Sequence, residues 1–338
     1  MTTCINKFAL LAFAVALTLS NASDSYALEK LRMAIPVPAF SYYSIYVARD
    51  LGYFKDEGID MEIIVTQGDG PDVDALIAGS VQFTSSTPNR LFTTFQQGKP
   101  LLGVLNMFNR VAINCFINNQ SAAAADIKQK AVLDEKVKKL KGMTIGVSRP
   151  GAFTYFVAAD LLKRAGYTPQ VDAKVIGVGG GAAMLAALEN KQIDVGCFAS
   201  PTPELAVSRG KASMFVNNTL GEDTTLDEFL FSVLYVRPDY ARDHKDTVTK
   251  VVRALKRAMV YAVKTPFEEQ RPVLTATFGN IDEVVMRDAL SNNQGGINAS
   301  GEITEKAYKG AADYLIASGA ITDAAPYASV IDKSFWSK

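Results

Sequence analysis

The chain has 338 residues, and its 35 lysine and arginine residues balance 35 aspartate and glutamate residues. No basic cluster with interleaved aromatic residues occurs, which argues against a nucleic-acid-binding protein. Beyond residue 27 no apolar stretch approaches the length that spans a bilayer, which argues against an integral membrane protein.

The first 27 residues predict an export signal. Lys7 gives a positively charged start, residues 8–19 form an apolar run of about a dozen residues, and residues 25–27 offer small side chains for cleavage. The run is too short to span a membrane. Cys4 precedes it and is therefore not placed to carry a lipid anchor. We expect residues 1–27 to be removed and a soluble, monomeric mature protein to reach the periplasm.

The mature chain retains two cysteines and is long enough for two lobes. Its length of about 310 residues favours two hydrophobic cores over one. Cys115 and Cys197 lie far apart, each within an apolar run typical of a strand. A chain of this size does not need a covalent cross-link, so we expect two buried free thiols.

Short β-branched runs alternate with amphipathic stretches from Leu31 onward, which is typical of an α/β architecture with mainly parallel sheets. Ser41 is predicted to cap the first helix and Gly52 to end it. Strands are expected in the first part of the chain at 32–37, 61–66, 82–85 and 101–108.

The sequence contains an internal repeat. The segment MAIPVPAFSYYSIYVARDLGYF from Met33 recurs in pattern as MTIGVSRPGAFTYFVAADLLKRAGY from Met143. Downstream, ALIAGSVQFTSSTP ending at Pro88 matches ALENKQIDVGCFASP ending at Pro201. The offset of about 110 residues is too long for a solenoid unit and indicates a duplicated domain. We therefore expect two similar lobes built from β-α-β units.

Two crossings between the lobes are expected. A strand-like run at 111–119 carries the chain out of the first lobe, and another at 229–239 precedes a helical C-terminal region. A chain that leaves once and returns once makes a two-segment hinge. The expected lobes are 28–112 plus 238–338, and 113–237.

The chain resembles the nitrate/sulfonate/taurine-type periplasmic solute-binding proteins over nearly the whole mature chain. The runs that carry the resemblance are YVARDLGYFKDEGIDMEIIVTQGD, ALIAGSVQF, GMTIGVSRPGAFTYFVAADLLKRAGY, ALENKQIDVGCFASPTPELA and VRPDYARDHKDTVTKVVRAL. The same superfamily includes binders of thiamine pyrimidine precursors and the yeast pyrimidine synthase relatives. The resemblance implies a type II periplasmic binding protein fold, a small-molecule ligand, the membrane permease of an ABC importer as partner, and neither cofactor nor metal.

The ligand site is expected where strands enter helices. Ligands of open parallel sheets bind beyond the carboxyl ends of the strands, where unpaired backbone N–H groups point outward. Two facing lobes would enclose the ligand on closing. The candidate residues of the first lobe are Phe40, Ser41, Tyr42, Gln67, Gly68, Asp69, Ser86 and Thr87. Those of the second lobe are Ser148, Arg149, Gly151, Ala152, Phe153, Thr154, Gly180 and Ser200.

The nature of the ligand stays open at this point. Arg149 can donate two hydrogen bonds to a sulfonate or carboxylate, or it can be a solvated loop charge. We expect a small organic anion, with a neutral heteroaromatic such as a thiamine pyrimidine precursor as the alternative. Asp69 and Asp72 can be solvated or capping acids, or an acid here can instead recognise an amine. The glycine-rich turn at 177–184 lacks the lysine of a phosphate-binding loop, so it does not favour phosphate.

No catalytic constellation accompanies these residues, so we expect a binding protein and not an enzyme. The alternatives are an enzyme on the same fold and a ligand carrier for a sensor. His244, the single histidine, is expected to face solvent near a helix start, and Trp336 is expected to dock the C-terminus.

Overall fold

The computed structural model describes residues 27–66, 68–226, 228–279 and 281–337. The expected signal segment up to residue 26 and the candidate Gln67 lie outside these described residues. Within them, none of the helices combines the length and the apolar character that crossing a membrane requires.

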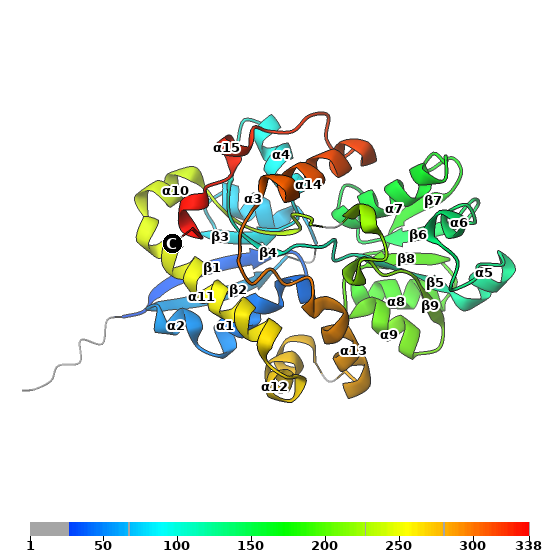
Figure 1. The fold of residues 1–338 in the computed structure, drawn as a ribbon, viewed down its shortest axis with the longest axis horizontal. Helices are drawn as coiled ribbons and strands as arrows, with labels where there is room; N and C mark the ends of the chain where they lie inside the picture. The colour runs from blue at the N-terminus through cyan, green and yellow to red at the C-terminus, as the bar shows by residue number, and fades with distance from the viewer. Residues whose placement is uncertain (1–26, 67, 227, 280, 338) are drawn as a thin grey trace, which may run out of the picture.

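The described chain forms two lobes, each built on a five-stranded mixed sheet (Figure 1). The first sheet has the order β2-β1-β3-β10-β4 and the second β7-β6-β8-β5-β9. Strands β10 and β5 run antiparallel to their neighbours, and the remaining pairs are parallel. The strands of the first sheet are β1 (Glu29–Ile35), β2 (Ile59–Val65), β3 (Phe83–Ser86), β4 (Leu102–Phe108) and β10 (Ser232–Val236). Those of the second are β5 (Asn114–Asn118), β6 (Thr144–Val147), β7 (Lys174–Gly177), β8 (Val195–Phe198) and β9 (Ala212–Val216).

The central strands are buried along their whole length. Strands β3, β5, β8 and β10 are buried at every residue, because they are central and helices cover both faces. The edge strands β2 and β7 alternate buried with more exposed residues. These central strands are buried whatever their side chains, since β3 has the sequence FTSS.

The internal repeat is confirmed, because the two lobes have the same topology. In each lobe, strands and helices alternate in the same order, and one antiparallel strand that arrives from the other lobe is inserted beside the last strand. The first lobe contains η1 (Phe40–Tyr42), α1 (Tyr43–Asp50), α2 (Tyr53–Asp56), α3 (Pro71–Ile77) and α4 (Asn89–Gln96). The second contains α5 (Asn119–Ala124), α6 (Leu133–Val137), α7 (Phe153–Arg164), α8 (Gly181–Glu189), α9 (Thr202–Ser208), η2 (Asn218–Leu220) and η3 (Thr224–Leu226).

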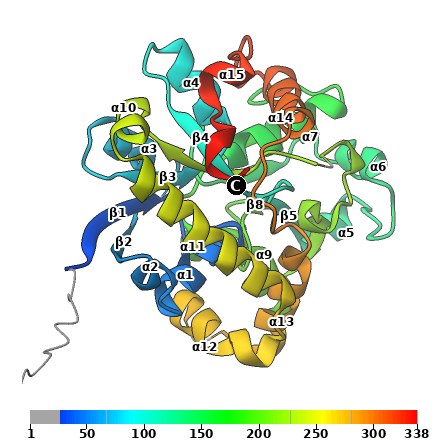
Figure 2. The ribbon, with the colours of Figure 1, turned by 60° about the vertical axis from the view of Figure 1, so that its left-hand side comes forward.

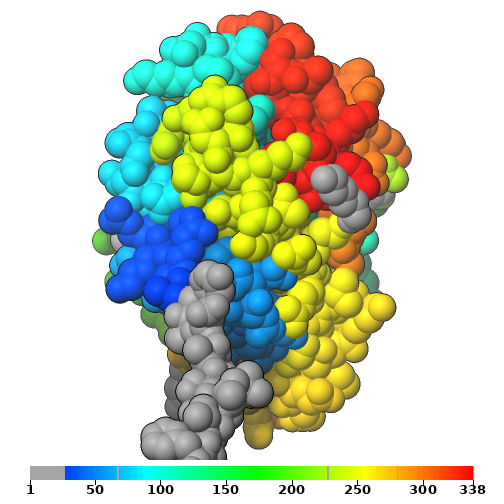
Figure 3. All heavy atoms as spheres, turned by 90° about the vertical axis from the view of Figure 1, so that its left-hand side faces the viewer, coloured from blue at the N-terminus to red at the C-terminus, as the bar shows by residue number. Residues whose placement is uncertain are grey.

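The C-terminal helices cover the first lobe and reach the second. Figure 2 shows α11 lying across α1, and Figure 1 shows α13 beside α9 and α14 beside α7. These helices are α10 (Pro238–Asp243), α11 (Lys245–Lys264), α12 (Phe267–Phe278), α13 (Glu283–Gln294), α14 (Glu305–Ser318), α15 (Tyr327–Val330) and η4 (Lys333–Phe335). The C-terminus packs against the first lobe, whose outer face is drawn in Figure 3. Trp336 is buried as expected, and His244 is exposed where α11 begins.

Two segments cross between the lobes and bond to each other. The N–H of Phe229 donates to the carbonyl oxygen of Asn109 at 2.8 Å, and that of Phe231 to Phe108 at 3.1 Å. The return crossing therefore ends before β10. This corrects the boundary expected at residue 237, because β10 completes the first sheet by pairing with both β3 and β4.

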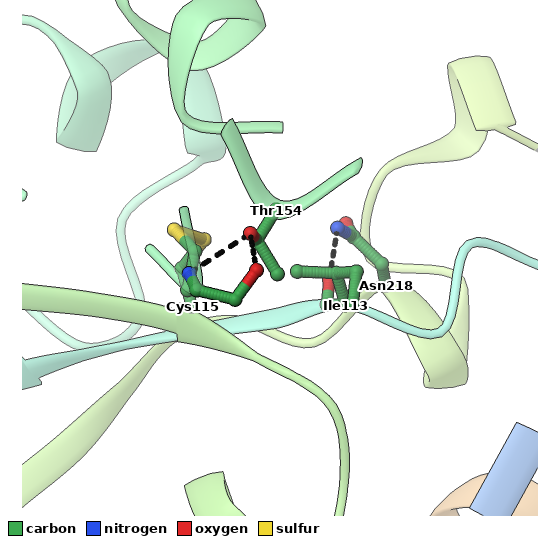
Figure 4. Close-up of a disulfide and its surroundings, with 6 residues drawn as sticks. Ile113, Cys115, Thr154 and Asn218 are labelled. Carbon is green, nitrogen blue, oxygen red and sulfur yellow. Dashed lines mark hydrogen bonds between the residues drawn. A yellow bond between two sulfur atoms is a disulfide. The ribbon is translucent and has the colours of Figure 1, made fainter. Parts of the chain in front are cut away.

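The expectation of two free thiols is wrong. Cys115 and Cys197 form a disulfide, with their Cα atoms 4.1 Å apart. They lie on β5 and β8, which are adjacent antiparallel strands whose register places the two cysteines opposite each other. Their separation of 82 residues conceals this, because strand neighbours depend on sheet order and not on sequence distance. The bond lies close to Thr154 of α7 (Figure 4).

Candidate functional site: a cavity between the lobes

A cavity lies between the two lobes and is lined by loops from both. The contributing segments follow β1, β2, β3, β6 and β8, and both crossing segments add one residue each. The lining residues are Pro36, Val37, Ser41, Tyr42, Gly68, Asp69, Thr87, Ile113, Ser148, Phe153, Thr154, Phe198, Ala199 and Phe231. This cavity is lined by both lobes and by the hinge, so its shape changes when the lobes move.

The cavity is small in this conformation, at about 30 Å³. A single water molecule needs about 10–15 Å³ on the same measure. The lobes therefore stand closed, and a ring-sized ligand requires them to stand further apart than they do here.

Aromatic side chains form the apolar wall. The ring of Phe153, at the start of α7, meets that of Phe231 edge to face at 5.1 Å between centroids and stacks on Tyr314 at 5.9 Å. Phe231 belongs to the return crossing and Tyr314 to α14. Edge-to-face and offset pairs are favourable beyond their buried area. The start of α7 is thus fixed against the hinge of the molecule.

Two hydroxyl groups of the second lobe bond to each other at the cavity. Thr154 Oγ1 accepts from the backbone N–H of Ser148 at 3.1 Å and lies 2.8 Å from Ser148 Oγ. Figure 4 shows Thr154 and, nearby, Asn218, whose side-chain amide donates to the carbonyl oxygen of Ile113 at 2.7 Å. Polar atoms of the wall are therefore held by internal hydrogen bonds.

The carboxylate of Asp69, on the first lobe, reaches across the cavity and bonds to the second lobe. Its Oδ2 accepts from the backbone N–H of Phe153 at 3.0 Å and from Thr87 Oγ1 at 3.5 Å. The N–H of Phe153 belongs to the first turn of α7, where the helix dipole favours negative charge. The anion-binding position that the sequence suggests for a ligand is therefore occupied by a carboxylate of the protein.

The loop that carries Asp69 is shaped by two glycines with positive φ, Gly68 at 138° and Gly70 at 116°. Few other residues adopt these angles without strain. The N–H of Gly70 donates to Oδ1 of Asp72 at 2.7 Å, which fixes the turn. Burial raises the pKa of Asp72, and the nearby charge of Asp69 raises it further.

Tyr42 contributes a neutral hydroxyl group to the cavity. Its side chain is buried, and burial raises its pKa well above the usual value, with a further contribution from the charge of Asp69. Apart from Tyr42, the one ionisable group among the lining residues that the structure describes is Asp69. The lining therefore carries a negative charge and no lysine or arginine.

The side chain of Arg149 lies beside the cavity and packs against the loop of the first lobe that contains Gly68 and Gly70. Its Nη2 is 3.2 Å from the point where a Cβ of residue 68 would lie, and 3.4 Å from the equivalent point at residue 70. This nitrogen is buried and has no hydrogen-bond partner among the described residues. Gly68 thus leaves room for the guanidinium group, which packs on the opposite lobe and does not line the cavity.

Half of the sixteen candidate residues from the sequence come together around this cavity. They are Ser41, Tyr42, Gly68, Asp69, Thr87, Ser148, Phe153 and Thr154. Seven others lie outside its lining, namely Phe40, Ser86, Arg149, Gly151, Ala152, Gly180 and Ser200. Gln67 is not among the described residues.

Phe40 and Ser200 contact each other across the lobes instead. The N–H of Phe40 donates to the carbonyl oxygen of Ser200 at 3.3 Å, and the Phe40 ring stacks on Phe278 at 4.6 Å. Ser41 lies in the turn η1 and does not cap α1, because a 3-10 turn precedes that helix. Sequence reasoning missed Pro36, Val37, Ile113, Phe198, Ala199 and Phe231, which follow strand ends or belong to the crossings.

The comparisons agree with this architecture. A family model described as NMT1/THI5 like matches residues 39–269. A solved structure from Bordetella bronchiseptica RB50 is similar with a TM-score of 0.77 and 23% identity, covering 90% of this chain and 95% of that one. The alkanesulfonate-binding protein SsuA from Xanthomonas axonopodis pv. citri, bound to MOPS, is similar with a TM-score of 0.68 and 17% identity, covering 90% and 98%.

The fold is the type II periplasmic binding protein fold. The same architecture also occurs in the desulfurization enzyme DSZB, with a TM-score of 0.61 and 14% identity, covering 91% of this chain and 97% of that one. The fold alone therefore does not separate binding from catalysis.

Proposed function

From the cavity between its lobes we propose that this chain, which belongs to the NMT1/THI5-like family, is the solute-binding component of an ABC-type importer. The observation that carries the proposal is that residues of both lobes and of both crossing segments line one cavity. Hinge closure then buries a solute and gives a transporter a loaded shape to recognise. The expected export signal at 1–27 would place the protein, as a monomer, in the periplasm beside the permease.

Binding is favoured over catalysis by the groups at the cavity. The hydroxyls of Ser148 and Thr154 bond to each other, so neither is paired with a general base. His244, the single histidine of the chain, lies where α10 meets α11 and stacks on Tyr240. The cysteines near the cavity are joined in a disulfide and are not nucleophiles.

The charge of the lining supports a neutral or cationic ligand over the organic anion that the sequence suggests. An anion would approach Asp69 and would find the N–H of Phe153 already bonded to it. A ligand N–H group can instead donate to Asp69, while Phe198 and Phe231 face its apolar part. We propose a compact, flat nitrogen compound, either an uncharged heteroaromatic with an N–H group or an organic amine.

A thermal-shift screen of the chain from Leu28 onward tests both steps. The panel contains uncharged N–H heteroaromatics, organic amines, and sulfonates with carboxylates. A ligand at a thousand times its Kd stabilises the folded state by about 4 kcal/mol, which raises the Tm measurably. We expect members of the first two classes to raise it, and Asp69→Ala to reduce the shift. Asp74→Ala, an exposed acid on the neighbouring helix α3, is the matched control.

Two outcomes would contradict the proposal. If sulfonates and carboxylates alone raise the Tm, the ligand class is wrong while the binding role stands. If a compound that raises the Tm is converted to a product detected by mass spectrometry, the protein is an enzyme.

A further inference from the structure

A second groove lies on the seam between the lobes and shares no lining residue with the cavity described above. It runs between α9 of the second lobe and α13 of the C-terminal helices, which lie side by side in Figure 1. Its volume is about 390 Å³. The side chains that matter are Glu204 and Val207 from α9, and Val284, Asp288 and Asn292 from α13.

Glu204 is the buried polar group of this groove. The residue is 6% exposed, and its Oε1 accepts from Ser200 Oγ at 2.9 Å and from Asn292 Nδ2 at 3.3 Å. Its Oε2 is buried and has no hydrogen-bond partner in the part of the chain that the structure describes. A charged Oε2 lacks a donor, and a protonated one lacks an acceptor. A buried polar atom without a hydrogen-bond partner is unfavourable in either protonation state.

No basic side chain pairs with the carboxyl groups of the groove among the described residues. Across the described residues, Glu204 and Asp288 have no lysine or arginine nitrogen within 4.0 Å. The basic residues nearest along the two helices are engaged elsewhere, because Arg209 pairs with Glu189 and Arg287 pairs with Glu268 and Glu283. One carboxyl group from each lobe therefore faces the groove without a counter-charge.

The rim of the groove is apolar. Val207 is 38% exposed and Val284 is 67% exposed, and both line the groove. A ligand that fits must bring a positive charge to the floor and a short hydrocarbon part to the rim. An alkylammonium or alkylguanidinium group has this combination, because its charge sits at the end of an apolar stem.

We propose that the groove between α9 and α13 binds one alkylammonium or alkylguanidinium group, with its cationic head at Glu204 and Asp288 and its alkyl part against Val207 and Val284. The group is carried by a free amine or by a lysine or arginine of a protein segment. Since the two walls belong to different lobes, binding depends on how the lobes are arranged.

A calorimetric titration of the whole mature chain with n-butylguanidinium chloride at constant ionic strength tests the proposal. Uncharged n-butylurea, which has the same shape, is the matched probe. We expect saturable binding of the cation, with butylurea failing to bind. Glu204→Gln and Asp288→Asn should each weaken it about tenfold or more, as expected for loss of a charged hydrogen bond. Asp74→Ala, an exposed residue on α3, should leave it unchanged.

The proposal would be overturned if butylurea bound as tightly as butylguanidinium, or if Glu204→Gln and Asp288→Asn both kept the wild-type affinity. The Asp288→Asn variant guards against a folding artefact, because Asp288 is exposed. A capped valine-arginine-valine peptide separates the two sources. Tighter binding of the peptide than of butylguanidinium assigns the group to a protein segment, and equal binding assigns it to a free amine.

Discussion

The carboxylate of Asp69 and the backbone N–H of Phe153 lie 3.0 Å apart, one on each lobe of the protein. The contact places a negative charge at the N-terminus of α7, where the sequence alone led us to expect an anionic ligand. It joins the lobes and sets the charge of the cavity at the same time. The ligand class that we propose therefore rests on the position of this one carboxylate.

Asp69→Asn should weaken the affinity for an N–H ligand about tenfold or more, because the ligand loses a hydrogen bond to a charged acceptor. Calorimetry with the tightest compound from the screen measures this change. Asp74→Asn, on the exposed side of α3, should leave the affinity within about twofold, since it removes no ligand contact. Equal affinities for the wild type and Asp69→Asn would show that Asp69 does not contact the ligand.

Thr154→Val should lower the free energy of unfolding by about 1–3 kcal/mol. The substitution leaves the N–H of Ser148 without the acceptor that Thr154 Oγ1 supplies at 3.1 Å. Urea denaturation of the unliganded protein measures the loss. Thr249→Val on α11, at a half-buried position, is the control, because its hydroxyl donates to a carbonyl oxygen within its own helix. A loss at Thr154 no larger than at Thr249 would contradict the assigned hydrogen bond.

Removing the disulfide with the double substitution Cys115→Ala and Cys197→Ala should lower the free energy of unfolding by about 4 kcal/mol, because the bond closes a long loop of the unfolded chain. Thiol titration of the mature chain in denaturant checks the bond itself. No thiol should react before reductant is added, and two should react afterwards. Two reactive thiols without reductant would restore the free-thiol interpretation.

Asp72 should make stability fall as the pH rises. Its pKa in the folded state is raised from 3.8, chiefly by burial, so the folded protein keeps a proton that the unfolded chain has already lost. Its contribution is fully present below the unfolded value and is lost as the pH rises through the raised folded value. The stability of the wild type relative to Asp72→Asn should therefore decrease from about pH 4 upward.

Urea denaturation across that pH range measures this difference, and Glu283→Gln provides a control of opposite sign. Hydrogen bonds from Arg287 and Arg271 lower the pKa of the exposed Glu283, so its contribution is lost as the pH falls. A relative stability of Asp72→Asn that does not change with pH would contradict the raised pKa of Asp72.

The sequence predicts the fold because the duplication repeats its strand-turn-helix signals in order. The same logic places Asp69, Ser148 and Thr154 at one cavity, since each follows the carboxyl end of a strand. Ile113 and Phe231 escape prediction because their apolar crossing segments look like core strands.

Features that depend on strand neighbours also lie beyond the sequence pattern. The pairing of Cys115 with Cys197 and the membership of β10 in the first sheet both follow from sheet order, which local periodicity does not encode. Arg149 was expected at the ligand, but the space above Gly68 lets its guanidinium group pack on the opposite lobe.

A crystal structure of the mature chain with the tightest compound from the screen tests the central claim most directly. The account predicts the compound between the lobes, with a nitrogen within hydrogen-bond distance of Asp69 and its apolar part against Phe198 and Phe231. A compound bound outside this cavity, or in contact with one lobe alone, would contradict it.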